Sequence, residues 1–257
     1  MKKILAISAA AALVFCAAFG AKKDSGGDTV SAKYGNTVSG DQMNKNSQFV
    51  FFQGKGDKGG LLCVGHSLTR HAPSPKIGWP NDWGMAASAE EKDYVHILWN
   101  NLKKVYGDMP LCIAKGAYFE REFPNADKII PRYYKAARDF KPRFIVISIV
   151  DNVKPQMAKE HDFIKEYEKL VDYLNPDGKA KMIITTGWYP LKSLNKDLKE
   201  FAKRRNITIV DLAPIYNTEG SKATGLWKHK GVASHPGDKG MKMLADAYFE
   251  ALTGRKP

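Results

Sequence analysis

The run Arg-Phe-Ile-Val-Ile-Ser-Ile-Val at residues 143–150 constrains the fold more than any other feature of this 257-residue chain. A short run of apolar, mostly β-branched residues is typical of a strand that is buried on both faces. Such a strand belongs to a sheet with helices on both sides, because antiparallel sheets commonly leave one face to water. Four further segments predict strands of the same sheet: 61–64, 109–114, 181–186 and 207–212.

Segments with apolar residues at helical spacing separate these strands. The first follows Ser-Ala-Glu-Glu at residues 88–91, which predicts a capping box with Ser88 as the N-cap. Strands that alternate with helices form βαβ units, and hence a parallel sheet covered by helices on both faces. Strand propensity at residues 48–53 predicts an additional edge strand. The predicted helices span 88–104, 125–139, 161–174, 194–204 and 238–252.

The predicted fold class is therefore α/β: a three-layer α/β/α sandwich around a five-stranded parallel sheet, similar to flavodoxin. The sequence contains neither an internal repeat nor a second apolar core, so residues 48–257 are expected to form one domain. Cys63 and Cys112 both lie in predicted strands. We expect two buried free thiols there, and a bridge is the alternative if the strands are neighbours.

The N-terminus has the pattern of an export signal. Two lysines precede an apolar stretch and small residues, which predicts a secretory signal peptide over residues 1–20. Cys16 opens an alternative, because Leu-Val-Phe-Cys resembles a bacterial lipoprotein box, although Phe15 stands where a small residue is usual. Residues 21–47 are rich in Ser, Gly, Asn and Lys and are expected to be a flexible polar segment. The predicted location is periplasmic or extracellular, with a lipid-anchored form as the alternative.

The formal net charge of +13 bears on the partners of the chain. Excess lysine on an exported protein favours anionic surfaces such as envelope polymers or acidic glycans. The basic residues are scattered and are not interleaved with base-stacking aromatic residues, so a nucleic-acid partner is not expected. The sequence leaves the oligomeric state open.

Gly-His-Ser-Leu-Thr at residues 65–69 directly follows the predicted strand 61–64. Gly65 permits a tight turn, which places Ser67 in the crevice where open α/β sheets bind their ligands. A serine at such a place can act as a nucleophile if a base lies nearby. On these residues alone, an ordinary polar turn at a strand end is the alternative.

Three stretches of the chain resemble the SGNH/GDSL hydrolases. Residues 65–69 are similar to the first block of that family, which usually reads Gly-Asp-Ser-Leu or Gly-Asn-Ser-Ile. Trp-Pro-Asn-Asp-Trp-Gly-Met-Ala-Ala-Ser at 79–88 looks like the continuation in one exported bacterial branch, and Ser-His-Pro-Gly-Asp-Lys-Gly-Met at 234–241 matches the last block. The resemblance covers residues 60–252 and implies the SGNH hydrolase fold.

The resemblance also implies roles for individual residues. Ser67 matches the nucleophile and His235 the catalytic base. The oxyanion hole would comprise the Ser67 and Gly116 N–H groups and the side-chain amide of Asn152. The sequences around Gly116 and Asn152 match the family pattern less closely. The alternatives are that Gly116 is an ordinary turn glycine and that Asn152 caps a strand end.

The chain departs from the family at two places near the expected site. Val232 stands where the family has the aspartate that orients the histidine. Either Ser67 and His235 work as a dyad with a backbone carbonyl as the orienting group, or an acid comes from elsewhere. Asp211 and Asp238 are the two candidate acids. The second departure is His66, which replaces the usual Asp or Asn beside the nucleophile.

Aromatic residues follow or precede several of the expected site residues. Trp83, Trp188 and Trp227 are candidates for stacking on sugar rings, and anchoring of loops is the alternative. The histidines show no spacing that is typical of a metal site. The resemblance requires neither a metal nor an organic cofactor.

These observations predict an exported serine esterase that removes small acyl groups, acetyl in particular, from carbohydrate. Two alternatives stay open. A non-catalytic glycan-binding protein on the same fold would account for the missing acid and the altered first block. A lipase or lysophospholipase of the cell envelope is the other alternative.

Overall fold

The computed structural model describes residues 49–55 and 59–257, which form a six-stranded sheet with the order β1-β3-β2-β4-β5-β6. Strands β2 to β6 are parallel to one another, and β1 pairs antiparallel with β3. The predicted α/β fold with five parallel strands is confirmed, and the additional edge strand is present as β1. The strands are β1 (Val50–Gln53), β2 (Leu61–Gly65), β3 (Leu111–Lys115), β4 (Phe144–Ser148), β5 (Lys181–Thr185) and β6 (Thr208–Val210).

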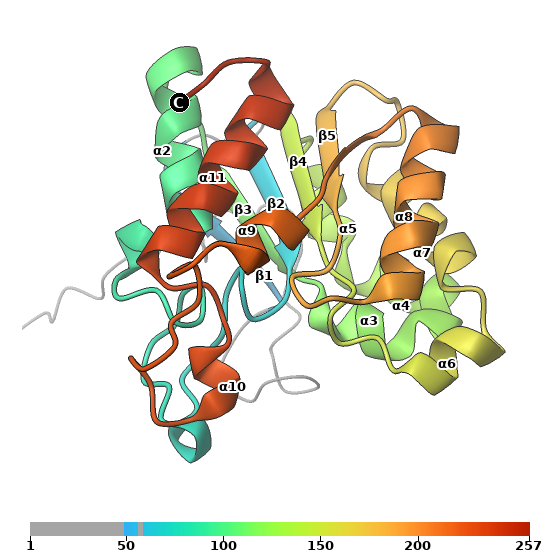
Figure 1. The fold of residues 1–257 in the computed structure, drawn as a ribbon. Coiled ribbons are helices and arrows are strands. Elements are labelled where there is room, and N and C mark those ends of the chain that lie inside the picture. The colour runs from blue at the N-terminus through green and yellow to red at the C-terminus, as the bar shows by residue number, and fades with distance from the viewer. Residues whose placement is uncertain (1–48, 56–58) are drawn as a thin grey trace, which may run out of the picture.

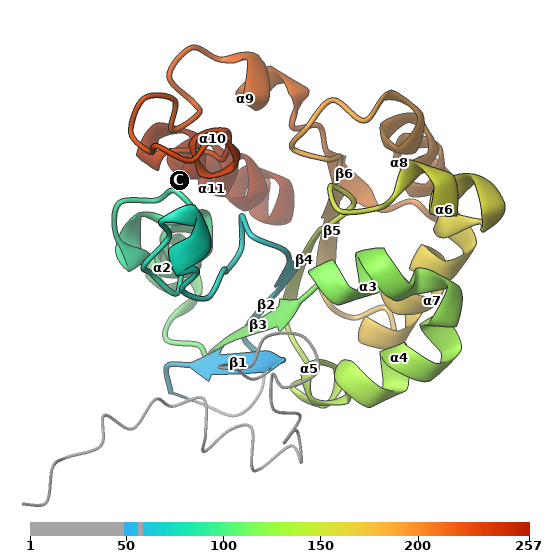
Figure 2. The same cartoon turned by 90° about the horizontal axis from the view of Figure 1, so that it is seen from below.

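Helices cover both faces of this sheet (Figures 1 and 2). One face carries α2 (Tyr94–Tyr106), α9 (Ala213–Asn217) and α11 (Asp238–Thr253). The other carries α3 (Ala117–Glu122), α4 (Ala126–Tyr133), α5 (Lys135–Asp139), α7 (Phe163–Leu174) and α8 (Lys192–Arg205). Two short helices, α6 (Pro155–Glu160) and α10 (Lys230–Ala233), lie in the loops.

The central strand β2 shows how the sequence produces the two cores. Its side chains alternate, so Leu62 and Val64 pack into one apolar cluster while Leu61 and Cys63 pack into the other. All five residues of β2 are buried. A strand of this kind therefore needs apolar residues at successive positions, which explains the unbroken apolar run.

The two cysteines are buried free thiols, as expected. They lie on adjacent strands, but the register pairs Cys112 with Leu62 and not with Cys63. Their side chains consequently enter opposite cores. Burial raises the pKa of both thiols well above the ordinary value.

The first predicted helix begins later than its capping pattern indicates. Helix α2 starts at Tyr94 with Asp93 as its N-cap, whose Oδ1 accepts from the His96 N–H at 2.8 Å. Ser88 is not the cap, because its N–H and Oγ–H both donate to Asp238. The buried Asp93 carboxylate, which also accepts from the Gly84 N–H, is the stronger acceptor.

Another difference concerns residues 125–139, which form two helices, α4 and α5, instead of one. The division falls at Tyr134, shortly after Pro131 inside α4. Proline lacks the N–H that a continuous helix requires.

The predictions for residues 1–20, Cys16 and 21–47 lie outside the described residues. Within the described part of the chain, no helix is both long enough and apolar enough to cross a membrane.

Candidate active site

Ser67 lies just beyond the carboxyl end of β2, at the edge where the parallel strands of the sheet end. The chain turns there, with the N–H groups of Thr69 and Arg70 both donating to the His66 carbonyl. Gly65 is necessary for this turn, since a Cβ at that position would lie 1.7 Å from Thr69 Oγ1. The Thr69 hydroxyl is itself held by Tyr94, at 2.6 Å.

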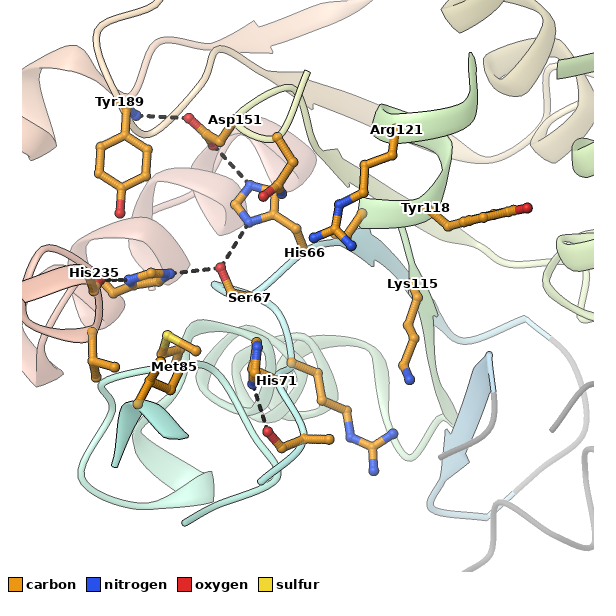
Figure 3. A pocket seen from close by; sticks show the side chains of 18 of the residues that line it. His66, Ser67, His71, Met85, Lys115, Tyr118, Arg121, Asp151, Tyr189 and His235 are labelled. Carbon is orange, nitrogen blue, oxygen red and sulfur yellow. Dashed lines mark hydrogen bonds and ion pairs between the residues drawn. The ribbon is translucent and has the colours of Figure 1, made fainter. Parts of the chain in front are cut away.

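The structure brings Ser67 and His235 together across 168 residues of sequence (Figure 3). Ser67 Oγ lies 2.7 Å from His235 Nε2. On the other side of the ring, Nδ1 lies 2.6 Å from the Gly231 carbonyl oxygen. Because a carbonyl only accepts, Nδ1 carries the proton, and Nε2 is left to accept the Ser67 O–H.

A backbone carbonyl therefore orients His235, and neither candidate acid does. Asp211 accepts from Lys199 Nζ at 2.6 Å and from the Thr186 hydroxyl at 3.2 Å. Asp238 is bonded to Ser88 and Lys92. Within residues 59–257, no carboxylate is hydrogen-bonded to His235, so of the two alternatives the structure has the backbone carbonyl, and neither Asp211 nor Asp238 is the orienting group.

The short helix α10 explains why the carbonyl takes this position. Gly231 lies four residues before His235, and the turn that ends α10 directs its carbonyl at the ring. Val232, which replaces the family's aspartate, is fully buried in a small apolar cluster with Trp79.

The environment of His235 favours the neutral imidazole. Burial lowers the pKa of His235 to about 4, and the positive charge of His66 and His71 acts in the same direction. The Gly231 carbonyl and Asp151 oppose that lowering without reversing it. At neutral pH the ring is thus free to accept a proton.

A second histidine, for which the sequence predicted no role in the site, contacts the same serine. His66 Nδ1 lies 3.4 Å from Ser67 Oγ, and His66 Nε2 lies 2.9 Å from Asp151 Oδ2. Asp151 also accepts from the N–H groups of Trp188 and Tyr189. Two features of the sequence could have indicated this pair. His66 stands where an Asp or Asn is usual, and Asp151 lies just beyond β4, the strand beside β2.

Gly116 does not offer the free N–H that the expected oxyanion role requires. Its N–H donates to the Gly65 carbonyl at 2.6 Å. Glycine is needed there for close approach, because a Cβ would lie 2.3 Å from Ile149 Cγ2. In this structure Gly116 therefore packs β3 against the serine turn, contrary to the expectation.

Asn152 does lie at the cavity, held by the buried carboxylate of Glu120. Its side-chain nitrogen donates to Glu120 Oε2 at 2.7 Å, and its backbone N–H donates to Oε1 at 3.0 Å. The side-chain amide has a second hydrogen, so it can still donate to a ligand. Val150 adopts a φ of 138° and donates its own N–H to Glu120.

The three tryptophans proposed for sugar stacking anchor loops instead. Trp188 is 1% exposed and donates its ring N–H to the Ser234 carbonyl. Trp83 donates to the Ala87 carbonyl, and Trp227 packs on the buried Trp79. Among the described residues, no tryptophan lines the cavity at Ser67, so the stacking expectation is wrong.

The cavity at Ser67 has a volume of about 590 Å³, and its wall combines basic side chains with apolar ones. Lys115 and Arg121 lie on the side of Ser67 away from His235 (Figure 3). Burial lowers the pKa of Lys115 to about 8, and the nearby positive charge of Arg70 contributes. The part of the chain that the structure describes holds no group of His, Cys, Asp and Glu side chains that could bind a metal ion.

Comparison with known proteins gives likeness in structure alone. No family model matches the chain, and no curated protein matches its sequence. A protein from Desulfitobacterium hafniense DCB-2, assigned to the lipolytic G-D-S-L family, aligns with 16% identity and a TM-score of 0.47 over 75% of this chain and 98% of its own. A member of the lipolytic protein G-D-S-L family from Veillonella parvula DSM 2008 aligns with 15% identity and a TM-score of 0.44 over 75% and 97%. At these values the likeness carries no conclusion about activity.

Proposed function

We propose that this chain is an exported serine ester hydrolase of the SGNH/GDSL family, which removes small acyl groups, acetyl in particular, from carbohydrate. One observation carries the hydrolase proposal: Ser67 Oγ lies 2.7 Å from a histidine nitrogen that is free to accept its proton. The family blocks at 65–69, 79–88 and 234–241 support it independently. Export rests on the signal pattern at residues 1–20.

In the proposed reaction, His235 Nε2 takes the hydroxyl proton as Ser67 Oγ attacks the ester carbonyl. The tetrahedral intermediate collapses when the alcohol leaves with the proton from His235, and an acyl-serine remains. Water then gives a proton to His235 and attacks the acyl group, which releases the acid and restores Ser67. The Gly231 carbonyl holds the ring in the required tautomer throughout, because it accepts from Nδ1.

The oxyanion of each intermediate would be stabilised by the Ser67 N–H and by the free hydrogen of the Asn152 amide. Glu120 supports the second donor, because it holds the Asn152 side chain and backbone together. Donors held in place before the reaction cost no reorganisation when charge develops.

The chemistry of the cavity favours a small polar ester over a long acyl chain. Its wall carries histidines, two arginines and a lysine, and these groups interrupt the apolar surface that Tyr118, Tyr189, Ile77, Met85 and Val232 provide. A fatty acyl chain would need a continuous apolar surface to offset its removal from the membrane or micelle. The envelope-lipase alternative is therefore less well supported than the carbohydrate esterase.

A non-catalytic glycan-binding protein is the second candidate. It is favoured by the lack of a carboxylate on His235 and by the engaged N–H of Gly116.

Hydrolysis of p-nitrophenyl acetate and of acetylated oligosaccharides by wild type and Ser67→Ala separates the two candidates. We expect Ser67→Ala to lose turnover while its circular dichroism spectrum and melting temperature stay near those of wild type, because Ser67 is only partly buried and lines the cavity. Equal turnover in the two proteins would leave only the glycan-binding candidate.

A further inference from the structure

Ser67 Oγ lies between two imidazole rings, one from each side (Figure 3). The hydroxyl has a single hydrogen, and the shorter contact, 2.7 Å to His235 Nε2, receives it. The lone pairs of Oγ then remain for a donor. His66 Nδ1, at 3.4 Å, is placed to be that donor.

Asp151 determines which protons His66 carries. The carboxylate can only accept, so the 2.9 Å contact requires a proton on His66 Nε2. Asp151 is itself held by the N–H groups of Trp188 and Tyr189, at 3.0 and 2.9 Å, and therefore cannot easily turn away. For Nδ1 to donate as well, the ring must be the imidazolium.

We propose that His66 is a second catalytic histidine, whose imidazolium donates through Nδ1 to the Ser67 oxygen while Asp151 positions it. This inference rests on the proposed hydrolase function and adds a role to it. A positive charge beside Oγ lowers the proton affinity of the hydroxyl, so Ser67 loses its proton more readily during attack. The same charge helps Ser67 to depart as the leaving oxygen in deacylation.

The charges around His66 agree with the imidazolium form. Burial by itself would lower the pKa of His66, but the carboxylates of Glu120 and Asp151 raise it above the ordinary value, against a smaller opposing effect of Arg121. His66 and His235 repel each other when both are charged, which contributes to the low pKa of His235. The two rings therefore hold opposite protonation states between their pKa values.

The low pKa of His235 explains how a protonated His66 would help catalysis. A histidine with a pKa of about 4 accepts a proton less readily than one near neutrality. A serine whose proton affinity is lowered by a neighbouring cation offsets that weakness. In a catalytic triad, a carboxylate accepts a hydrogen bond from the histidine that acts as the base. Here the Asp151 carboxylate instead accepts from His66, which contacts Ser67 Oγ.

The test is the pH dependence of kcat/KM in wild type, His66→Asn, His66→Gln and Asp151→Asn. Wild type should lose activity at alkaline pH, because His66 is protonated only below its raised pKa. Both His66 variants should lose roughly 10-fold or more of kcat/KM near neutrality and should no longer show the alkaline limb. Asp151→Asn should move that limb to lower pH, since the carboxylate no longer raises the pKa of His66. His161→Asn, a histidine outside the cavity, is the matched control.

A readout besides activity is the titration of His66 by NMR in the inactive Ser67→Ala protein, where a pKa above the ordinary ~6.5 is expected. An unchanged alkaline limb in folded His66→Asn and His66→Gln, or a His66 that titrates below ~6.5, would overturn the inference. Neither result affects the proposed hydrolase function, which is tested separately by the comparison of wild type with Ser67→Ala.

Discussion

The low pKa of His235 makes a quantitative prediction about acid activity. If catalysis needs the neutral ring, activity is present above the folded-state pKa and is lost as the pH falls through about 4. At a pH of ~5.5, a histidine with a pKa of about 4 is ~97% neutral, whereas one at the ordinary ~6.5 is ~9% neutral. The two cases therefore differ roughly 10-fold in the fraction of active enzyme at that pH.

The assay is kcat/KM for p-nitrophenyl acetate from pH ~3.5 to ~6.5, with circular dichroism at each pH. The structural control matters because an unfolded histidine binds protons at higher pH than the buried one. Between the two pKa values the unfolded state therefore gains stability as the pH falls, by up to about 3 kcal/mol. A half-maximal rate near pH ~6.5 in fully folded protein would refute the reasoning, since it would show a histidine that burial does not affect.

Three further predictions concern the remaining site residues. Asn152→Ala should lower kcat by roughly 10²–10³ with little change in KM, because one oxyanion donor is lost; an effect on KM alone would mean that Asn152 only positions the substrate. Asp211→Asn and Asp238→Asn should each cost far less than the ~10⁴ of a neutralised triad aspartate, and a collapse of kcat in either would reveal a triad that the structure does not contain. Trp188→Phe should lower the melting temperature, since it removes the hydrogen bond to Ser234 from a buried ring, and should leave KM for acetylated oligosaccharides within about twofold; a large rise in KM would restore the stacking role.

The fold was predictable from sequence because its signals are local. The central strands β2 and β4 of the parallel sheet are buried on both faces, so they appear as unbroken apolar runs such as 143–150. The helices between them show apolar residues at helical spacing. The start of α2 was not predictable in the same way, because Ser88 and Asp93 both resemble caps and the contact with Asp238 decides between them.

From the sequence, the site was predictable only for residues that lie in recognisable motifs. Ser67 and His235 lie in such motifs at the ends of elements, and the structure places them in contact. The partner of His66 depends on strand order, since Asp151 reaches it only because β4 lies beside β2. Tertiary packing decides whether the N–H of Gly116 is free and whether the indole of Trp188 is exposed. Neither property can be recognised in the sequence.

Covalent labelling with a fluorophosphonate tests the central claim most directly. This reagent phosphonylates a serine whose proton is taken by a neighbouring base, and fluoride leaves. We predict one adduct per chain in the intact mass of the wild-type protein, mapped by peptide sequencing to Ser67, and no adduct in Ser67→Ala. An unmodified wild-type protein, or an adduct on a different residue, would contradict the assignment of Ser67 as the nucleophile.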